Sequence, residues 1–257
     1  MKLLVKLGGT LLDAPESRDR LATQIACARA RSIEITVVHG GGKQMTRYLA
    51  ERGIESRFVN GLRVTTQETI DAVLKVFAGS VNHELVASLN RAGALAVGLS
   101  GIDAFLAEAE QMDPALGAVG RVTGSNPALL DVLAANGFLP VVACVAGDRR
   151  GNIYNVNADQ MAVACASAFR ADQLVFLTDV EGVLDEAKQV RPVLTASESR
   201  ALIAGGVATG GMQAKLNAAL AALDGGVAQV RIAPGASDRV LERILAGETI
   251  GTRMVLQ

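Results

Sequence analysis

Short apolar segments alternate with helix-like segments along almost the whole of this chain of 257 residues. Most of the apolar segments would carry hydrophobic residues on both faces of a strand, and such strands need cover on both sides. The alternation therefore predicts an α/β fold, a three-layer αβα sandwich with a mainly parallel central sheet. The expected strands are 2–7, 33–38, 94–99, 139–145, 174–177, 227–233 and 253–256.

Capping patterns and apolar periods place helices between these strands. The box Thr65-x-x-Glu68 predicts the start of a long helix that runs to about Arg91. Thr195-x-x-Glu198 has the same pattern and predicts another helix start. The segments 54–65 and 100–124 show little helical period, so we expect hairpins or irregular turns there. The other helices are expected over about 15–32, 43–52, 127–136 and 238–246, with two more that end near Phe169 and carry Lys215.

Charge and hydropathy argue against two classes of partner. The formal net charge of −1 gives no reason to expect nucleic acid, and no apolar run reaches the roughly 18–20 residues that span a bilayer. Residues 1–6 carry charge within their apolar stretch, unlike a signal peptide. We interpret Cys27, Cys144 and Cys165 as small buried side chains in a reducing compartment, because they lie far apart in apolar surroundings. The expectation is a cytoplasmic protein that binds neither nucleic acid nor a membrane.

Two glycine-rich turns close strands near the start of the chain, Lys6-Leu7-Gly8-Gly9 and His39-Gly40-Gly41-Gly42-Lys43. Backbone N–H groups at a strand-to-helix turn form a nest for an anion, and glycine lets a ligand approach without a Cβ in the way. Either turn alone is a weak signal, because glycine also simply ends strands. Together they predict two anionic groups held near each other. The chain has neither a Walker A pattern nor G-x-G-x-x-G, so P-loop and dinucleotide sites lack their main support.

Three basic residues occupy positions where an anion could meet them, and each also has an ordinary structural interpretation. Lys6 stands near the end of an apolar strand, where a buried ammonium needs a partner, or it snorkels from an edge strand. Lys215 follows a glycine cluster on an alanine-rich helix, where it could equally be solvated. Arg63 could clamp a carboxylate through two hydrogen bonds, or lie on the surface of a hairpin.

Asn155, Asn157 and Asp159 crowd the start of one helix. Asn157 as an N-cap explains one of the three residues. Asp159 either favours the helix dipole or orients a lysine. His39 precedes three glycines, and we favour a role in stabilising that turn over a role in catalysis. With only two histidines and no cluster of carboxylates, no dedicated metal site is expected.

Taken together, these segments resemble the amino-acid kinase family. The resemblance runs from about residue 2 to Gly251-Thr252-Arg253, and the motifs follow the family's order. Within the family they are most similar to members that use ATP to phosphorylate the side-chain carboxylate of N-acetyl-L-glutamate, a step of arginine biosynthesis. The motifs are Lys6-Leu-Gly-Gly, His39-Gly-Gly-Gly, Asn60-Gly-Leu-Arg-Val-Thr, Asn155-Val-Asn-Ala-Asp-Gln, Thr178-Asp-Val-Glu-Gly-Val and Gly210-Gly-Met-x-x-Lys215.

The resemblance implies a role for each matched residue. Lys6 and Lys215 would be catalytic and stabilise the transferring phosphoryl group, with Asp159 organising both lysines. Gly8 and Gly9 would place backbone N–H groups beside the phosphates. The residues implied for the acylated amino acid are Gly41, Gly42, Arg63 and Asn155. Those implied for the nucleotide are Asp179, Val180, Glu181, Gly182, Val183, Leu184, Val207, Ala208 and Thr209.

Cofactors, lobes and assembly follow from the same resemblance. Mg²⁺ would be carried mainly by the ATP. Residues 1–170 would form a lobe for substrate binding and dimer contact, and residues 171–257 a lobe for ATP, joined by one continuous sheet. Arginine-inhibited relatives carry a helix before the first strand, whereas the first strand begins here at residue 2. We therefore expect no arginine inhibition, and a homodimer rather than a hexamer, with the helix over 66–91 as its interface.

Two departures from the family pattern bear on substrate preference. Lys43 stands where many relatives have proline or a small residue, and residues 100–112 are poorer in glycine than expected. Two other functions therefore stay open. One is a kinase of N-acetylated or carrier-linked aminoadipate in lysine biosynthesis. The other is a sensor of the same fold that binds an amino acid or nucleotide and transfers nothing.

Overall fold

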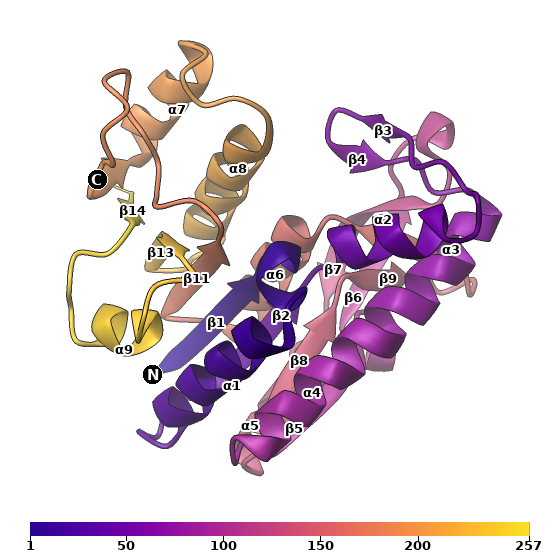
Figure 1. Ribbon diagram of the computed structural model, residues 1–257, viewed down its shortest axis with the longest axis horizontal. Coiled ribbons are helices and arrows are strands. Elements are labelled where there is room, and N and C mark those ends of the chain that lie inside the picture. The colour runs from indigo at the N-terminus through magenta and orange to yellow at the C-terminus, as the bar shows by residue number, and fades with distance from the viewer. Residues whose placement is uncertain (257) are drawn as a thin grey trace.

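A largely parallel sheet of eight strands forms the centre of the molecule (Figure 1). The computed structural model describes residues 1–256. Six neighbouring strands run parallel to one another. The other two strands, at one edge of the sheet, run parallel to each other and antiparallel to the six. In spatial order the strands are β12 (Val193–Thr195), β14 (Thr252–Val255), β13 (Gln229–Pro234), β11 (Gln173–Thr178), β1 (Lys2–Leu7), β2 (Glu34–His39), β8 (Leu139–Ala143) and β5 (Ala96–Ser100).

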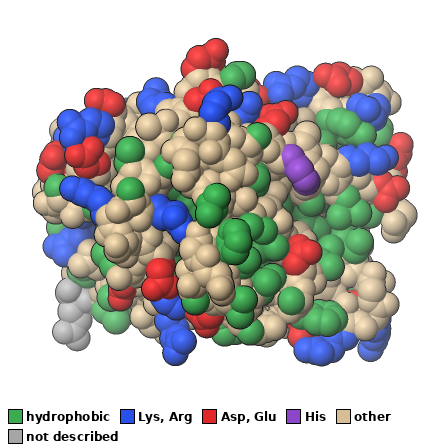
Figure 2. Space-filling view, turned by 90° about the horizontal axis from the view of Figure 1, so that it is seen from below, with side chains coloured by type: hydrophobic (Ala, Val, Ile, Leu, Met, Phe, Trp, Pro, Cys, Tyr) green, Lys and Arg blue, Asp and Glu red, His purple; other side chains and the backbone are tan. Residues whose placement is uncertain are grey.

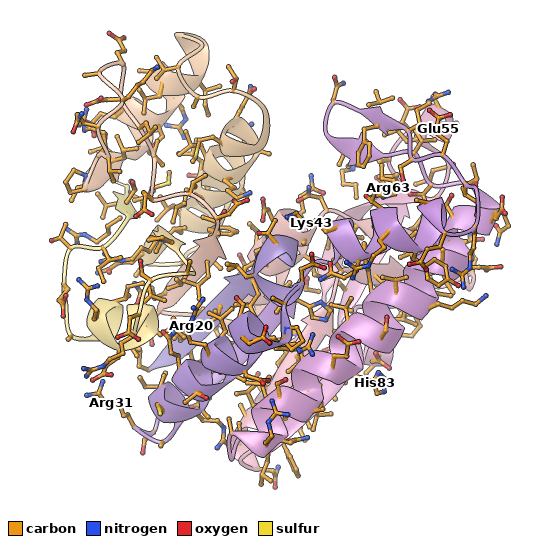
Figure 3. The ribbon with its side chains drawn as sticks, viewed as in Figure 1. Arg20, Arg31, Lys43, Glu55, Arg63 and His83 are labelled. Atoms are coloured by element: carbon orange, nitrogen blue, oxygen red, sulfur yellow. The ribbon has the colours of Figure 1, made fainter. Side chains whose placement is uncertain are left out.

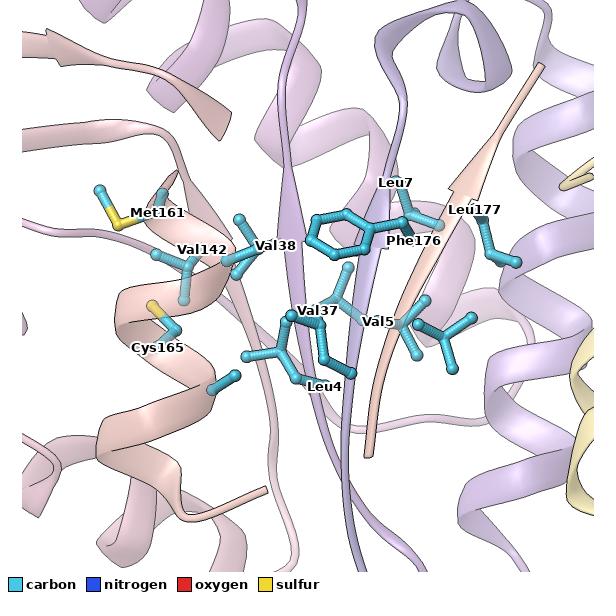
Figure 4. Packing of buried hydrophobic residues seen from close by; sticks show 14 of the residues in the cluster. Leu4, Val5, Leu7, Val37, Val38, Val142, Met161, Cys165, Phe176 and Leu177 are labelled. Carbon is cyan, nitrogen blue, oxygen red and sulfur yellow. The ribbon is translucent and has the colours of Figure 1, made fainter. Parts of the chain in front are cut away.

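Helices cover both faces of this sheet, so the predicted three-layer arrangement is confirmed. One face is covered by α1 (Pro15–Arg29), α4 (Asn82–Arg91) and α9 (Val240–Leu245). The other is covered by α5 (Ala128–Ala135), α6 (Ala158–Phe169) and α8 (Gly210–Asp224). The interior is built from the Leu, Val, Ala and Phe side chains of β1, β2, β8, β11 and α6 (Figure 4). The sheet is continuous across the lobe boundary expected at residue 171, because β1 pairs with β11.

Four short strands form a small closed barrel beside the main sheet. They are β6 (Ala107–Gln111), β7 (Val119–Ser125), β9 (Val145–Gly147) and β10 (Ile153–Val156). The hairpin expected within 100–124 is confirmed as the antiparallel pair β6 and β7. The expected single strand over 139–145 is wrong, because it divides at Cys144 into β8, which stays in the main sheet, and β9, which joins the barrel. Two short 3₁₀ turns, η3 (Asp103–Phe105) and η4 (Pro114–Leu116), flank β6.

The long helix expected after residue 65 is present, but its start and its middle differ from expectation. Thr66, not Thr65, caps α3 (Gln67–Val73), because the Thr66 side chain accepts a hydrogen bond from the Thr69 N–H. The segment then continues as η2 (Leu74–Val81), which is π-helical, before it becomes α4. A π-helical stretch inside a helix is rare and often marks a functional region.

The remaining elements lie at the ends of the sheet strands. A 3₁₀ turn, η1 (Gly9–Leu12), follows β1, and α2 (Gly42–Ala50) follows β2. The strands β3 (Phe58–Val59) and β4 (Leu62–Arg63) form the hairpin expected over 54–65. The second capping box is confirmed at the start of α7 (Ala196–Ala204). No helix in the described residues is long and apolar enough to cross a membrane.

The cysteine expectation holds for two of the three residues. Cys144 and Cys165 are buried, and burial raises the pKa of each thiol to about 12, so both are neutral thiols. Cys27 is exposed, contrary to expectation, because it lies on the outer side of α1.

Candidate active site

A buried ion pair joins the end of β1 to the first turn of α6. Lys6 Nζ lies 2.5 Å from Asp159 Oδ1, and both side chains are 8% exposed. The pleat explains the meeting, since Lys2 and Lys6 point to the same face of β1 and Lys2 contacts Phe169 of α6. Asp159 follows Asn157, whose side chain caps α6 by accepting from the N–H groups of Asp159 and Gln160. Lys6 is therefore not a snorkelling surface lysine.

Lys215 reaches the same carboxylate from α8. Its Nζ lies 3.4 Å from Asp159 Oδ2, and its side chain is 20% exposed. The helices α6 and α8 pack side by side on one face of the sheet, which brings together residues 56 positions apart. Burial acts to raise the pKa of Asp159, but the charges of Lys6 and Lys215 outweigh it and hold the pKa below its usual value. Two ammonium groups therefore share one ionised carboxylate.

The two glycine turns converge, as their positions at neighbouring strand ends suggested. A Cβ built on Gly9 would lie 3.1 Å from the Gly42 N atom and 3.5 Å from the Gly41 Cα atom. Gly42 has open space where a Cβ would project, whereas a Cβ on Gly41 would lie 2.8 Å from the Phe77 ring of η2. Gly41 is thus required by packing, and Gly42 faces a space that a ligand can enter.

The Gly8 N–H is already used within the protein. It donates to the Leu177 carbonyl of β11 at 3.0 Å, which extends the pairing of β1 with β11. Of the Gly8 and Gly9 pair that we expected beside the phosphates, only the Gly9 N–H lacks an acceptor among residues 1–256. Gly8 instead places the turn that exposes Gly9.

His39 stabilises its turn, in agreement with the interpretation of the sequence. Its Nδ1 lies 2.9 Å from the Gly40 carbonyl and its Nε2 lies 2.9 Å from Asn82 Nδ2. Nδ1 therefore donates and Nε2 accepts, which is the pattern of a neutral imidazole. Burial lowers the pKa of His39 to about 4. Asn82 also donates to the Val141 carbonyl at 3.0 Å, so this buried pair connects α4 to β2 and β8.

Arg63 is buried beneath the β3–β4 hairpin and faces α2 (Figure 3). Its Nη2 donates to the Gly42 carbonyl at 3.1 Å and to Thr46 Oγ1 at 2.9 Å, and its Nη1 donates to Ser56 Oγ. Two of the five guanidinium N–H donors remain. No carboxylate in the described part of the chain pairs with Arg63, and burial lowers its pKa. A buried guanidinium with unused donors and no counter-ion is suited to bind an external carboxylate.

A groove of about 560 Å³ lies between α2 and the hairpin, next to Arg63. Lys43 stands at its edge, at the start of α2 (Figure 3). Phe58 lies over the Arg63 guanidinium at 4.6 Å and also borders the groove. The lining residues are Asp13, Gly42, Lys43, Thr46, Arg47, Ala50, Phe58 and Arg63.

Asn155 lies on β10, and its side chain turns toward the base of the hairpin. Asn155 Nδ2 donates to Thr65 Oγ1 at 3.1 Å. Sequence reasoning singled out Asn155 and Arg63 but missed Thr65 and Thr46, which hydrogen-bond with them. The sequence did contain an indication for Thr65, because Thr65 belongs to the same motif as Arg63. The capping-box pattern led us to interpret Thr65 as a helix cap instead.

The residues expected at the nucleotide lie in two segments after residue 171. Asp179 to Leu184 form the loop after β11, in which Val180 and Leu184 are exposed and Val183 is buried. The Val183 N–H donates to Thr252 Oγ1 at 2.8 Å, so neither its side chain nor its N–H is free. The N–H groups of Val207 and Ala208 both donate to the Leu202 carbonyl of α7. Ala208 is also buried. Thr209 is exposed and is the N-cap residue of α8, the helix that carries Lys215.

Comparisons with known proteins agree with this arrangement. Residues 1–234 match the model of the amino acid kinase family. The chain is 79% identical over 255 residues to an acetylglutamate kinase of Solibacter usitatus, with 99% of each chain covered, and 43% identical to one of Acidobacterium capsulatum, again with 99% of each covered. Among solved structures, an N-acetylglutamate synthase from Neisseria gonorrhoeae, complexed with coenzyme A and N-acetyl-glutamate, superposes with a TM-score of 0.89 at 25% identity; the match covers all of this chain and 59% of that one. This chain belongs to the amino acid kinase family.

Proposed function

We propose that this protein transfers the terminal phosphoryl group of ATP to the side-chain carboxylate of N-acetyl-L-glutamate, forming N-acetyl-L-glutamyl 5-phosphate in arginine biosynthesis. Relatives that match it over 99% of their length are acetylglutamate kinases. The observation that carries the proposal is the shared contact of Lys6 and Lys215 with Asp159.

The reaction brings a carboxylate against a polyphosphate, so its main obstacle is repulsion between anions. Lys6, Lys215 and Asp159 together carry one net positive charge, on side chains that are largely withdrawn from water. In such surroundings a charge acts more strongly than in bulk water. When the phosphates arrive, the two ammonium groups would turn from Asp159 toward the migrating phosphoryl group, and Asp159 would keep them in place.

The acceptor needs no general base, because a carboxylate is already ionised at neutral pH. This agrees with His39, which is neutral and fully occupied by Gly40 and Asn82. Catalysis is then alignment and charge neutralisation. The Gly9 N–H and the space beside Gly42 would receive the anionic groups.

Binding of the acylated amino acid is assigned to Arg63 and Asn155. Arg63 would hold the α-carboxylate with its unused donors, and Asn155 would contact the acetamido group. Arg63 borders the groove between α2 and the hairpin. Asn155 contacts Thr65 at the base of that hairpin. Substrate therefore enters between α2 and β3–β4 in this proposal.

ATP is assigned to the second lobe, residues 171–257, beside the loop after β11 and the start of α8. In residues 1–256 no group of three or more His, Cys, Asp or Glu side chains could hold a metal ion. Asp159 is engaged by two lysines. The donor set therefore does not form a Mg²⁺ cage, and Mg²⁺ would be bound through the phosphate oxygens, where it supplies further charge neutralisation.

The proposed assembly is a cytoplasmic homodimer that uses the helix over 66–91. One face of the molecule gathers hydrophobic side chains (Figure 2), and His83, which belongs to this helical segment, is exposed. Strand β5 lies at the edge of the sheet on the same side as α4. Both features support a partner there. Sedimentation should give about twice the monomer mass.

A hydroxylamine-trapped acyl-phosphate assay tests the reaction. Purified protein, ATP and Mg²⁺ would be incubated separately with N-acetyl-L-glutamate, L-glutamate, L-aspartate and N-acetyl-L-aminoadipate. We expect turnover on N-acetyl-L-glutamate above that on the other three. A preference for the aminoadipate would identify the kinase of lysine biosynthesis, and absence of acyl phosphate and ADP with every acid would identify a non-catalytic sensor.

A further inference from the structure

Thr65 lies at the base of the hairpin that carries Arg63 and is fully buried. Its Oγ1 lies 2.8 Å from the carbonyl oxygen of Arg63 and 3.1 Å from Nδ2 of Asn155. One hydroxyl thus contacts both residues to which the proposed function assigns the acylated amino acid, although they are 92 positions apart in the chain. Neither contact serves the helix that follows, since Thr66 caps it.

The hydrogen-bond inventory of this hydroxyl permits one arrangement. A carbonyl oxygen can only accept, so the single Oγ1–H of Thr65 is donated to Arg63. Thr65 Oγ1 can then only accept from Asn155, which must present its NH₂ group and not its carbonyl oxygen. Thr65 thereby fixes which way the Asn155 carboxamide faces.

The oxygen of that carboxamide is left for a ligand. Among residues 1–256, none donates a hydrogen bond to Asn155 Oδ1. A free carboxamide oxygen accepts from N–H groups, and an acylated amino acid offers one such group, its amide N–H. The opposite orientation of the carboxamide would present two donors there and would leave the substrate N–H without an acceptor.

The backbone holds Thr65 in place before any ligand binds. Its N–H donates to the Leu116 carbonyl at 2.9 Å, and its carbonyl accepts from the Ala118 N–H at 2.7 Å. Gly117 lies between Leu116 and Ala118 and has a φ of +69°. A Cβ on Gly117 would lie 2.3 Å from the backbone carbonyl oxygen of Thr65. The Ala118 carbonyl in turn accepts from the Asn155 N–H at 2.9 Å. The segment 116–118 therefore sets the distance between Thr65 and Asn155.

We propose that Thr65 is a positioning residue, which orients the Asn155 carboxamide toward the amide N–H of the acylated amino acid and ties it to the Arg63 backbone. The inference rests on the proposed function, because it concerns how the same substrate is recognised. Thr65 itself touches no reacting atom. It acts on substrate affinity and not on the phosphoryl-transfer step.

The test compares Thr65→Val, which removes the hydroxyl at nearly constant shape, with Thr65→Ser, which keeps it. For Thr65→Val we expect KM for N-acetyl-L-glutamate to rise roughly 10- to 100-fold, since a buried hydrogen-bonding arrangement is lost. KM for ATP should change less than about 2-fold. Thr65→Ser should restore KM for the acid to within about 3-fold of the unchanged protein. A Thr65→Val variant with unchanged KM for the acid, or with equal rises for both substrates, would overturn the proposal.

Two controls separate positioning from folding. Thr66→Val removes the cap of α3 at the neighbouring exposed position, so it should lower the melting temperature and leave KM for the acid unchanged. In an Asn155→Ala background, Thr65→Val should add less than about 2-fold to KM, because its effect passes through Asn155; a full further effect would contradict the inference. If Thr65→Val does not fold, Thr65→Ala takes its place in both comparisons.

The outcomes separate the proposed function from this inference. If the unchanged protein fails to phosphorylate N-acetyl-L-glutamate, the proposed function and this inference are both rejected. If the unchanged protein is active but Thr65→Val leaves KM for the acid unchanged, only the inference is rejected.

Discussion

Lys6 Nζ and Asp159 Oδ1 are 2.5 Å apart and almost completely withdrawn from water, with Lys215 on the other oxygen of the same carboxylate. An ion pair in this position adds little net stability by itself, because both charges lose their hydration. The arrangement holds two ammonium groups against one carboxylate, so the cluster keeps one net positive charge. Removing one member should therefore affect stability and activity in different ways.

Asp159→Asn keeps the shape of the side chain and removes its charge. We expect the ligand-free protein to lose about 3 kcal/mol of unfolding free energy, since Lys6 would be left as an uncompensated buried charge. This corresponds to a fall of roughly 6–12 °C in Tm. Added phosphate should recover part of the loss in the variant. Asp131→Asn, which breaks the more exposed pair with Lys2, is the matched control and should cost less than about 1 kcal/mol. Equal melting of the two variants would contradict a special role for Asp159.

Lys215→Ala and Lys6→Ala remove the groups proposed to meet the migrating phosphoryl group. Each should lower kcat by roughly 10²–10³-fold, the scale for losing one donor that acts in the transition state. KM for the acylated amino acid should change much less. The exposed Lys75 on η2 offers a control, because Lys75→Ala removes the same charge away from Asp159. Steady-state kinetics decides, and wild-type turnover in Lys6→Ala would refute its assigned role.

The main sheet, and the meeting of Lys6 with the two glycine turns at one of its edges, could be predicted from the sequence for a physical reason. Strands apolar on both faces must lie inside a sheet, and polar residues at their carboxyl ends then meet at one edge. Lys6 and the two glycine turns follow from this rule. Lys215 does not, because its approach depends on how α8 packs against α6, and only the resemblance to the family indicated it.

The small barrel and the π-helical segment could not be predicted in the same way. Strand β9 separates from β8 at Cys144 with no break in the apolar pattern, because both strands are buried on both faces. In η2 the apolar period stays close to that of an α-helix, so residues such as Val76 and Phe77 do not reveal the wider turn. By sequence Thr65 fits the helix cap better than Thr66, because Glu68 completes its capping box. The structure reverses this, since Thr66 accepts from the Thr69 N–H and Thr65 instead contacts Asn155.

Gly9→Ala tests the convergence of the two turns. The new Cβ would lie 3.1 Å from the Gly42 nitrogen, which is backbone and cannot move aside as a flexible side chain does. The turns should separate by a few tenths of an ångström, and kcat should fall by roughly 10-fold or more because the anion sites lose their alignment. Gly124→Ala is the control, since a Cβ there meets nothing within 4 Å. Unchanged kcat in Gly9→Ala would show that the Gly9 turn does not hold phosphate.

Arg63→Lys keeps the positive charge and loses the planar fork. Lysine cannot reach Gly42, Thr46 and Ser56 and still offer paired donors to a carboxylate. We expect KM for N-acetyl-L-glutamate to rise roughly 10- to 100-fold with kcat changed less than about 5-fold. Arg91→Lys, an exposed position outside the groove, is the matched substitution and should leave both constants nearly unchanged. A fall in kcat alone would place Arg63 in the chemical step.

His39 makes stability depend on pH in one direction. Its pKa is about 4 in the folded protein, lowered by burial from the ordinary value of 6.5. Between these values the unfolded chain binds a proton that the folded protein does not, so acidification from pH 6.5 toward pH 4 should lower the unfolding free energy by up to about 1.4 kcal/mol per pH unit. His39→Gln can still donate to Gly40 and accept from Asn82 but cannot titrate. Urea unfolding at pH 4.5, 5.5, 6.5 and 7.5 should therefore give a shallower acid slope in His39→Gln than in the unchanged protein. Parallel slopes would mean that other groups cause the acid sensitivity, and that folding does not lower the pKa of His39.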